Sequence, residues 1–358
     1  MRYRVEIRTE EHASSLFRPT HRPCLLVLCL RKSQRTTHKA PTPPLRPNGG
    51  GVRGYWRRLS DGRVRVESFF VTTLVHVSDL HFGRPAVAER LDALREFIEE
   101  NRPDAVAVSG DLTQRCSNRE FSNARAYLDS LEKTAPCVVI PGNHDIRWLG
   151  AVARNLGFAG LFREQAHRFK YSRYKRHISD ELSPSLEVPG AVIAGVNTAH
   201  GITRGAITHR FRDLGVIGQV KHADMVRLKE AFENAAPEAA RVVMIHHNPI
   251  RGELSGRHGL ANTEQALHAF SDLGTELILC GHDHQDAIHT IERGAHGLII
   301  STAGTISNRI RPGRASSFNV VEIEDHELHI TAHAWRPGKG FVPSEDRTFP
   351  RRTASRQA

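Results

Sequence analysis

The chain has 358 residues, of which 39% are apolar, 25% charged and 6% aromatic. This composition can supply a full α/β core and excludes a wholly disordered chain. No apolar run approaches the roughly 18 residues that cross a bilayer, so we expect no membrane span. Five cysteines without a C-x-x-C pair fit neither a disulfide framework nor a cysteine zinc site. We therefore expect reduced thiols and a cytoplasmic location.

The net charge of +11 is concentrated at the start of the chain. Residues 1–70 contain 15 Lys and Arg against 5 Asp and Glu, whereas the remainder contains 35 against 34. The body is therefore near neutral, and a nucleic-acid partner is compatible with the sequence but not favoured. We expect a disordered, basic, Pro/Gly-rich extension over 1–70, one domain over 71–350 and a disordered basic tail over 351–358.

Short apolar runs alternate with amphipathic stretches from Thr72 onward, as expected of an α/β domain. Apolar residues recur on one helical face over 87–100 and 216–234, which predicts two helices. After Gly281 the pattern changes to alternating segments, which predict a second, more antiparallel sheet within the same domain. The buried strands are expected at 74–77, 105–108, 137–140, 192–196, 242–245 and 277–279. The later alternating segments are 287–291, 298–302, 318–323 and 326–334.

Polar clusters follow five of these strands, at the edge where open α/β sheets place their ligand sites. The clusters are 76–81, 109–111, 141–145, 246–249 and 280–284. In the first of them, Asp79 and His81 stand two residues apart at a strand end. In extended backbone their side chains would share one face and could hold one ion together.

The clusters supply carboxylate, amide and imidazole groups that can bind metal. Seven such ligands are too many for one four-coordinate ion and suit two ions that share Asp111. Mixed nitrogen and oxygen ligands without thiolate favour Mn, Fe, Zn or a similar metal over Mg or Ca alone. We therefore expect two divalent or mixed-valence ions per chain. The candidate ligands are Asp79, His81, Asp111, Asn143, His246, His282 and His284.

Two such ions, about 3.5 to 4 Å apart, can bridge a water, lower its pKa and clamp phosphoryl oxygens during in-line attack. The two ions carry a charge of +4, and the carboxylates of Asp79 and Asp111 reduce it to +2. A bridging hydroxide and a phosphodiester, each with one negative charge, balance the remainder. A small phosphoester, in particular a phosphodiester, is the expected substrate. His144 could protonate the leaving oxygen as general acid, with Asp145 or another acid holding its imidazole in the protonated form.

Taken in order, the five clusters resemble the motif set of the calcineurin-like metallophosphoesterases, which is Asp-x-His, Gly-Asp, Gly-Asn-His-Asp, His and Gly-His-x-His. The resemblance covers about residues 71–344. It implies a four-layer αββα sandwich of two mixed β-sheets flanked by helices. It also assigns Asp79, His81 and His284 to a first ion, Asn143, His246 and His282 to a second, and Asp111 to both.

Within that family, the motifs look like those of the bacterial branch that contains 3′,5′-cyclic-nucleotide phosphodiesterases. The alternatives are a nuclease of the same fold, a pyrophosphohydrolase and a non-catalytic binding scaffold. A nuclease would need a basic groove beyond the near-neutral body, and the lipid-A-type pyrophosphohydrolases carry Arg where this chain has His144. A scaffold would have lost ligands that this chain retains. A homo-oligomer is compatible with the sequence.

Other residues near the motifs have less specific meanings. His76 lies on an apolar strand and is expected in the core. For His247 and Asp283 the sequence leaves open a supporting role around the ligands or simple loop polarity. The basic and aromatic stretch 163–177 favours a helix with a solvated basic face over a contact with nucleic acid or anionic lipid.

Overall fold

A computed structural model of the chain describes residues 51–58, 64–147, 169–201, 217–250, 259–293 and 296–352. Most of the expected extension and tail lies outside these residues. Where the sequence analysis predicts disorder over 51–70, the structure contains strand β1 (Gly51–Arg58), which pairs with β2 (Val64–Val77). The alternation of valine with charged residues at 64–67 is a strand pattern. The stretch Gly54–Ser68 belongs to a separate unit, and the body is described by itself.

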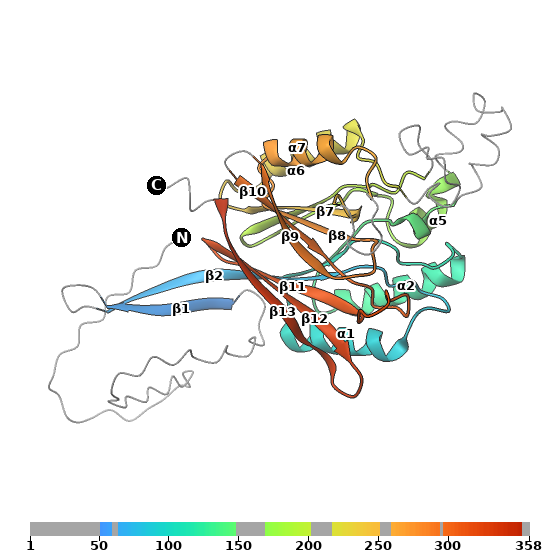
Figure 1. Ribbon diagram of the computed structural model, residues 1–358, viewed down its shortest axis with the longest axis horizontal. Coiled ribbons are helices and arrows are strands. Elements are labelled where there is room, and N and C mark those ends of the chain that lie inside the picture. Colours follow the sequence, from blue (N-terminus) through green and yellow to red (C-terminus); the bar gives the residue numbers. More distant parts are fainter. Residues whose placement is uncertain are drawn as a thin grey trace, which may run out of the picture. The chain divides into compact units, whose positions relative to one another are not determined.

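The body contains two mixed sheets (Figure 1). The first has the strand order β13-β12-β11-β2-β3-β4, and the second has the order β5-β6-β7-β8-β10-β9. The further strands of the first sheet are β3 (Ala105–Val108), β4 (Cys137–Val139), β11 (Ser317–Ile323), β12 (Glu327–Arg336) and β13 (Gly340–Pro350). Those of the second are β5 (Ser185–Val188), β6 (Ala191–Gly195), β7 (Ala240–His247), β8 (Leu277–Gly281), β9 (Ala287–Arg293) and β10 (His296–Thr302).

The alternating segments after Gly281 do not form a sheet of their own, so that expectation is wrong. Strand β10 pairs in parallel with β8 and in antiparallel with β9, whereas β11 pairs in antiparallel with β2 and with β12. The four segments therefore extend both sheets. Alternation of apolar and polar residues predicts a strand with one buried face, but it does not say which sheet edge the strand joins.

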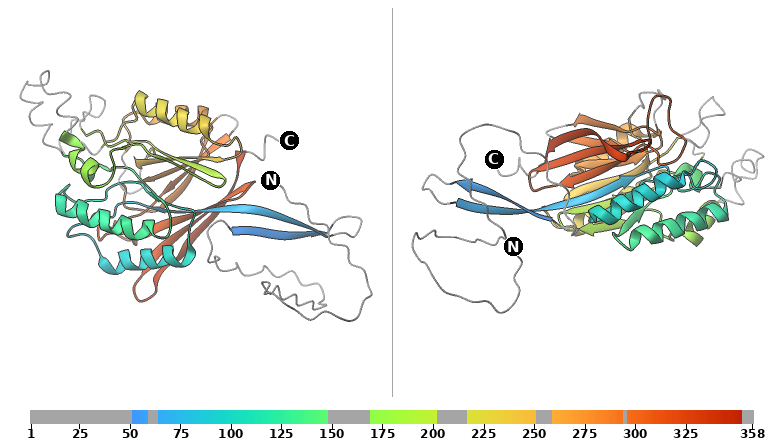
Figure 2. Two further views of the ribbon diagram at one scale, coloured as in Figure 1. Left: turned by 180° about the vertical axis from the view of Figure 1, so that it is seen from behind. Right: turned by 90° about the horizontal axis from the view of Figure 1, so that it is seen from below.

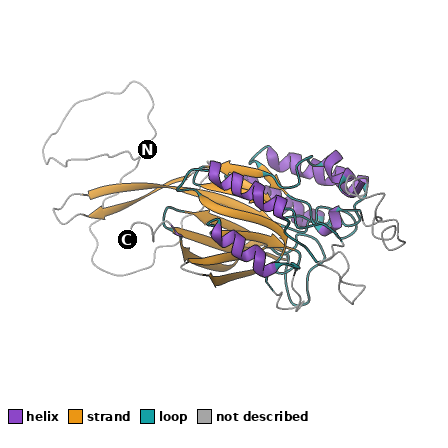
Figure 3. Cartoon of the chain, turned by 90° about the horizontal axis from the view of Figure 1, so that it is seen from above, coloured by secondary structure: helices purple, strands orange, loops and turns teal. Residues whose placement is uncertain are grey.

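Helices cover the outer faces of the two sheets (Figures 2 and 3). Helices α1 (Ala88–Asn101) and α2 (Asn118–Glu132) lie on the first sheet, and α6 (His222–Asn234) and α7 (Thr263–Asp272) lie on the second. The described residues also contain two short elements, the 3₁₀ turn η1 (Asn143–Asp145) and α5 (Ser172–His177). Within the described residues, no helix has both the length and the apolar character needed to cross a bilayer.

Three helices differ from the prediction, and one of them, α7, has no counterpart among the predicted elements. The helix expected over 216–234 begins only at His222, because the Gly218 amide donates to the Gly259 carbonyl at 2.6 Å and holds the preceding residues outside the helix. Helix α2 was not expected. Its start is marked by a capping box, in which Ser117 accepts from the Glu120 amide and the Glu120 carboxylate accepts from the Ser117 amide.

The strands bury apolar residues on both faces. In β3, Val106 and Val108 pack toward α1 and α2, whereas Ala105 and Ala107 face the second sheet. In β8, the even-numbered Ile278 and Cys280 pack toward α6 and α7, and the odd-numbered leucines face the first sheet. Three apolar layers thus separate four layers of secondary structure, which confirms the predicted αββα sandwich.

Parallel pairing places the candidate site residues together. Strands β2, β3 and β4 run parallel to one another in the first sheet, as do β6, β7, β8 and β10 in the second. The carboxyl ends of parallel strands meet at one edge of a sheet. The carboxyl ends of β2, β3, β4, β7 and β8, together with the loops that follow them, carry all five polar clusters.

The start of the expected tail is ordered. Arg351 is buried, and its guanidinium donates to the Glu276 carboxylate at 3.0 and 3.1 Å. It also donates to the carbonyls of Glu324 and Glu238. The side chain therefore links the ends of three segments that lie far apart in the sequence, and the buried carboxylate explains why this arginine is not part of a solvated tail.

We predict that Arg351→Ala lowers the free energy of unfolding by about 3 to 5 kcal/mol, because it leaves the Glu276 carboxylate buried without its partner. Denaturant unfolding measures this loss. The control Arg347→Ala removes an exposed ion pair with Glu345 and should cost less than about 1 kcal/mol. Equal losses in the two variants would contradict the structural role of Arg351.

Candidate metal centre

The loops after β2 and β3 run side by side. The Asp79 amide donates to the Gly110 carbonyl at 3.0 Å, and the His81 amide donates to the Asp111 carbonyl at 2.9 Å. Two side-chain ligands from the first loop therefore stand next to the carboxylate from the second.

The loop residues do not continue the extended strands, in contrast to the expectation for Asp79 and His81. Both have left-handed backbone, with φ of 56° and 46°. Asp111, His282 and His284 have φ of 53°, 73° and 56°. Residues other than glycine rarely adopt this region, and they concentrate at functional sites when they do. Five of the seven candidate ligands thus hold a conformation that costs free energy.

The first group of donors consists of Asp79, His81, His284 and one oxygen of Asp111, and all four residues are buried. The His284 Nε2 lies 3.0 Å from Asp79 Oδ1 and 3.1 Å from His81 Nε2. The His81 Nε2 lies 3.3 Å from Asp79 Oδ1 and 3.7 Å from Asp111 Oδ2. The group matches the first set that the family resemblance implies.

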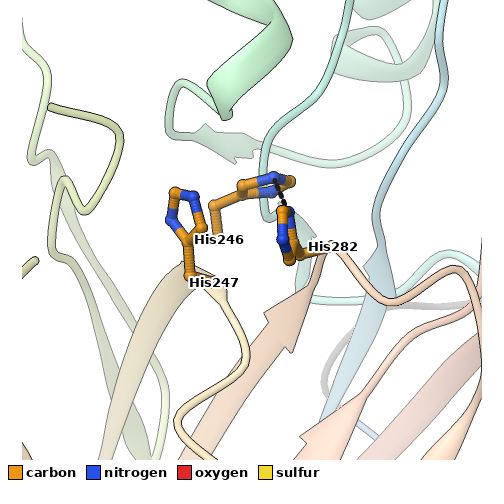
Figure 4. A group of neighbouring side chains, drawn as sticks. All are labelled: His246, His247 and His282. Carbon is orange, nitrogen blue, oxygen red and sulfur yellow. Dashed lines mark hydrogen bonds between the residues drawn. The ribbon is translucent and has the colours of Figure 1, made fainter. Parts of the chain in front are cut away.

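The second group consists of Asn143, His246, His282 and the other oxygen of Asp111. The Asn143 Oδ1 lies 3.0 Å from both His246 Nε2 and His282 Nδ1. The two imidazole nitrogens lie 3.3 Å apart, and the rings approach each other in Figure 4. The Asp111 Oδ1 lies 3.4 Å from His246 Nε2. Asp111 therefore directs one oxygen to each group.

The close approach of these loops depends on glycine. A Cβ on Gly142 would lie 2.2 Å from Asp111 Oδ1, and a Cβ on Gly281 would lie 1.8 Å from Ser78 Oγ and 2.7 Å from Asp79 Oδ2. A larger residue at Gly142 would displace Asp111, and one at Gly281 would displace Ser78 and Asp79. The glycines of Gly-Asn-His-Asp and Gly-His-Asp-His thus have a packing role.

The donor set fits metal ions. Ligands about 2.0 to 2.2 Å from an ion lie about 3.0 to 3.6 Å from one another, which is close to the separations within each group. The buried Asp79 Oδ1 accepts no hydrogen bond. In addition, the Asp111 carboxylate, despite burial, raises the pKa of His246 to about 9. A bound cation would neutralise the carboxylates of Asp79 and Asp111 and displace the proton from the His246 imidazole.

His144 lies at the edge of the first group. Its ring centroid is 5.0 Å from that of His81. Its Nδ1 donates to the Gln114 carbonyl at 2.8 Å, and its Nε2 accepts from the Arg309 guanidinium at 3.0 Å. The imidazole therefore stands beside the candidate ligands without being one of them.

The expectation that Asp145 holds the His144 imidazole is wrong. The Asp145 carboxylate turns away from the ring and accepts from the amides of Gly142, Leu112 and Thr113 at 2.8 to 3.0 Å. Burial and the nearby Asp111 carboxylate raise the pKa of Asp145 to about 6. Because its carboxylate accepts from the Gly142 amide, Asp145 closes the turn that carries Asn143. In a 3₁₀ turn residues 143 and 145 point in different directions, so the two side chains have different surroundings.

The remaining polar residues have supporting contacts. The His247 Nδ1 bonds to Thr198 Oγ1 at 2.8 Å, and the His247 ring lies beside His246 and His282 (Figure 4). An imidazole nitrogen of His247 also lies within 4.8 Å of donors of those two residues. The Asn143 Oδ1, in contrast, lies 3.0 Å from a nitrogen of each of these residues, so Asn143 remains the candidate ligand at this position. Asp283 accepts from Asn248 at 2.9 Å.

His76 is a core residue, as expected. It is fully buried, and its Nε2 bonds to Ser109 Oγ at 3.0 Å. Burial lowers the pKa of His76 to about 3, so it stays neutral near pH 7. In contrast, no sequence pattern points to Arg309, because no motif surrounds it and it lies more than twenty residues after the last candidate ligand, His284.

Comparison with known proteins supports the same fold. The purple acid phosphatase PPD1 of yellow lupin (Lupinus luteus) superposes with a TM-score of 0.55 at 12% identity, covering 85% of this chain and 60% of the lupin chain. PhoD superposes with a TM-score of 0.53 at 10% identity, covering 79% and 70%. At these identities the similarity concerns the fold alone.

A curated relative is the glycerophosphodiester phosphodiesterase GpdQ of Enterobacter lignolyticus, which is 38% identical over 87 residues. This match covers 20% of the present chain and 29% of the relative. The profile of the calcineurin-like phosphoesterases matches residues 72–286, which is more than half of the chain and contains all seven candidate ligands. The chain therefore belongs to the calcineurin-like phosphoesterase family.

Proposed function

We propose that this chain hydrolyses phosphodiesters, such as cyclic nucleotides, with two divalent or mixed-valence ions of Mn, Fe, Zn or a similar metal. The observation that carries the proposal is the gathering of seven candidate ligands into two groups, one at each oxygen of Asp111. When bound, such a pair of ions supplies a hydroxide nucleophile near neutral pH and stabilises charge on the phosphoryl oxygens.

The protein side chains divide the remaining work. Asp79, His81 and His284 hold one side of the centre, and Asn143 with His246 and His282 holds the other. His144 stands outside both groups and acts as the general acid for the leaving oxygen. The Gln114 carbonyl, which accepts from Nδ1, orients the ring, so Nε2 is the nitrogen that would protonate the leaving group.

The name of the relative GpdQ supports a diester substrate and adds glycerophosphodiesters to the cyclic nucleotides. Cyclic nucleotides and glycerophosphodiesters both have an alkoxide leaving group that needs a proton. His144 would therefore protonate the leaving oxygen in either case. The near-neutral body disfavours a nuclease. The retained ligands disfavour a non-catalytic scaffold. A panel of cyclic nucleotides, glycerophosphodiesters and pyrophosphates, assayed with added Mn, separates these alternatives.

The proposal also covers the domain that carries catalysis and the location of the protein. We assign catalysis to the domain over 71–350. Within the described residues, Cys116, Cys137 and Cys280 form no disulfide, which supports a reducing, cytoplasmic location.

We predict two metal ions per chain and a larger loss of metal from Asp111→Asn than from a variant of any other ligand, because Asp111 belongs to both groups. Metal analysis after gentle dialysis measures the stoichiometry. Asp129→Asn, on the exposed face of α2, serves as the control and should retain both ions. One reproducible equivalent with full activity would exclude the two-ion proposal.

We predict that His144→Ala slows hydrolysis of cyclic nucleotides or glycerophosphodiesters by about 10²- to 10⁴-fold and largely spares bis-nitrophenyl phosphate. The nitrophenolate leaving group needs no proton, whereas an alkoxide does. Steady-state kinetics with both ions bound compare the substrates, and His329→Ala on β12 is the matched control. Equal losses on both substrates would show that His144 is not the proton donor.

A further inference from the structure

The loop between β10 and β11 carries an arginine to the edge of the metal centre. The Arg309 Nη1 donates to His144 Nε2 at 3.0 Å and lies 3.3 Å from Gln114 Oε1. The His144 ring in turn lies 5.0 Å from the His81 ring. A permanently charged group thus contacts His144, which in turn neighbours the first donor group.

The loop is fixed to the centre by hydrogen bonds. The Thr305 hydroxyl donates to the Asp79 carbonyl at 2.7 Å, and the Ser307 hydroxyl accepts from the Arg309 amide at 3.2 Å. The Arg90 guanidinium donates to the Ser307 carbonyl at 2.7 Å, and the Asn308 amide donates to the Pro85 carbonyl at 2.7 Å. The arginine backbone is therefore held in place relative to a candidate metal ligand.

The two contacts of His144 determine where its proton lies. The Gln114 carbonyl can only accept, so Nδ1 carries hydrogen, and a guanidinium can only donate, so Nε2 presents its lone pair to Arg309. In this arrangement Nε2 has no proton for a leaving group. The proposed acid can act only after Arg309 has moved to another acceptor.

A phosphoester supplies that acceptor. An anionic phosphoryl oxygen is a stronger partner for a guanidinium than a neutral imidazole nitrogen, and the planar fork of arginine matches phosphate geometry. We infer that Arg309 is a phosphate-binding residue, which passes from His144 Nε2 to a non-bridging oxygen of the substrate. This transfer frees the Nε2 lone pair, which then takes up a proton from solvent and can pass it to the leaving oxygen. The inference rests on the proposed phosphodiesterase function.

The test compares Arg309→Ala, Arg309→Lys and the control Arg95→Ala, which removes an exposed arginine of α1 that pairs with Asp92. We expect Arg309→Ala to weaken binding of inorganic phosphate, measured by calorimetry on metal-loaded protein, by about 10- to 100-fold, the value of a charged hydrogen bond. KM should rise by a similar factor for both alkyl and nitrophenyl diesters. Arg309→Lys and added guanidinium should each restore part of the loss, and Arg95→Ala should change nothing.

Two results would overturn the inference. The first is unchanged phosphate affinity and KM in Arg309→Ala. The second is a loss confined to kcat on alkyl diesters, as in His144→Ala, which would mean that Arg309 only orients the imidazole. Phosphate binding requires no turnover, so a wild-type protein that binds phosphate through Arg309 but hydrolyses no diester would refute the proposed function and leave the role of Arg309 standing.

Discussion

The position of the Asp111 carboxylate is the constraint on which the site depends. One of its oxygens faces His81 and the other faces His246, so a single side chain joins donors from both sheets. It can do so only because β3 lies between β2 and β4, and because the loops after these strands approach within hydrogen-bond distance. The four-layer packing then brings the ends of β7 and β8 to the same place.

This arrangement concentrates several unfavourable features at one edge of the fold. Two buried carboxylates lie close together, and several loop residues have left-handed backbone. Such costs persist only where the surrounding structure enforces them. Apolar layers on both faces of each sheet hold the loops in this conformation. A bound metal ion would offset part of the free-energy cost by neutralising the buried carboxylates.

The sequence predicts the buried parallel strands and the gathering of polar clusters at their ends, because such strands are continuous apolar runs and the candidate ligands follow them directly. It also predicts the separation of His144 from the ligands. It does not predict the left-handed backbone of Asp79 and His81, nor the orientation of Asp145, since both depend on hydrogen bonds between loops. The sheet that each strand after Gly281 joins also depends on tertiary packing. Arg309 could not be predicted from the sequence, because the His144 that it contacts lies 165 residues away and no motif surrounds the arginine.

The central claim is that Asp111 lies between two metal ions in a phosphodiesterase site. Anomalous diffraction from crystals of the Mn-loaded protein tests it most directly. We predict two peaks about 3.5 to 4 Å apart, one on each side of the Asp111 carboxylate, with Asp79, His81 and His284 around one and Asn143, His246 and His282 around the other. A single fully occupied peak, or two peaks that do not share Asp111, would contradict the account.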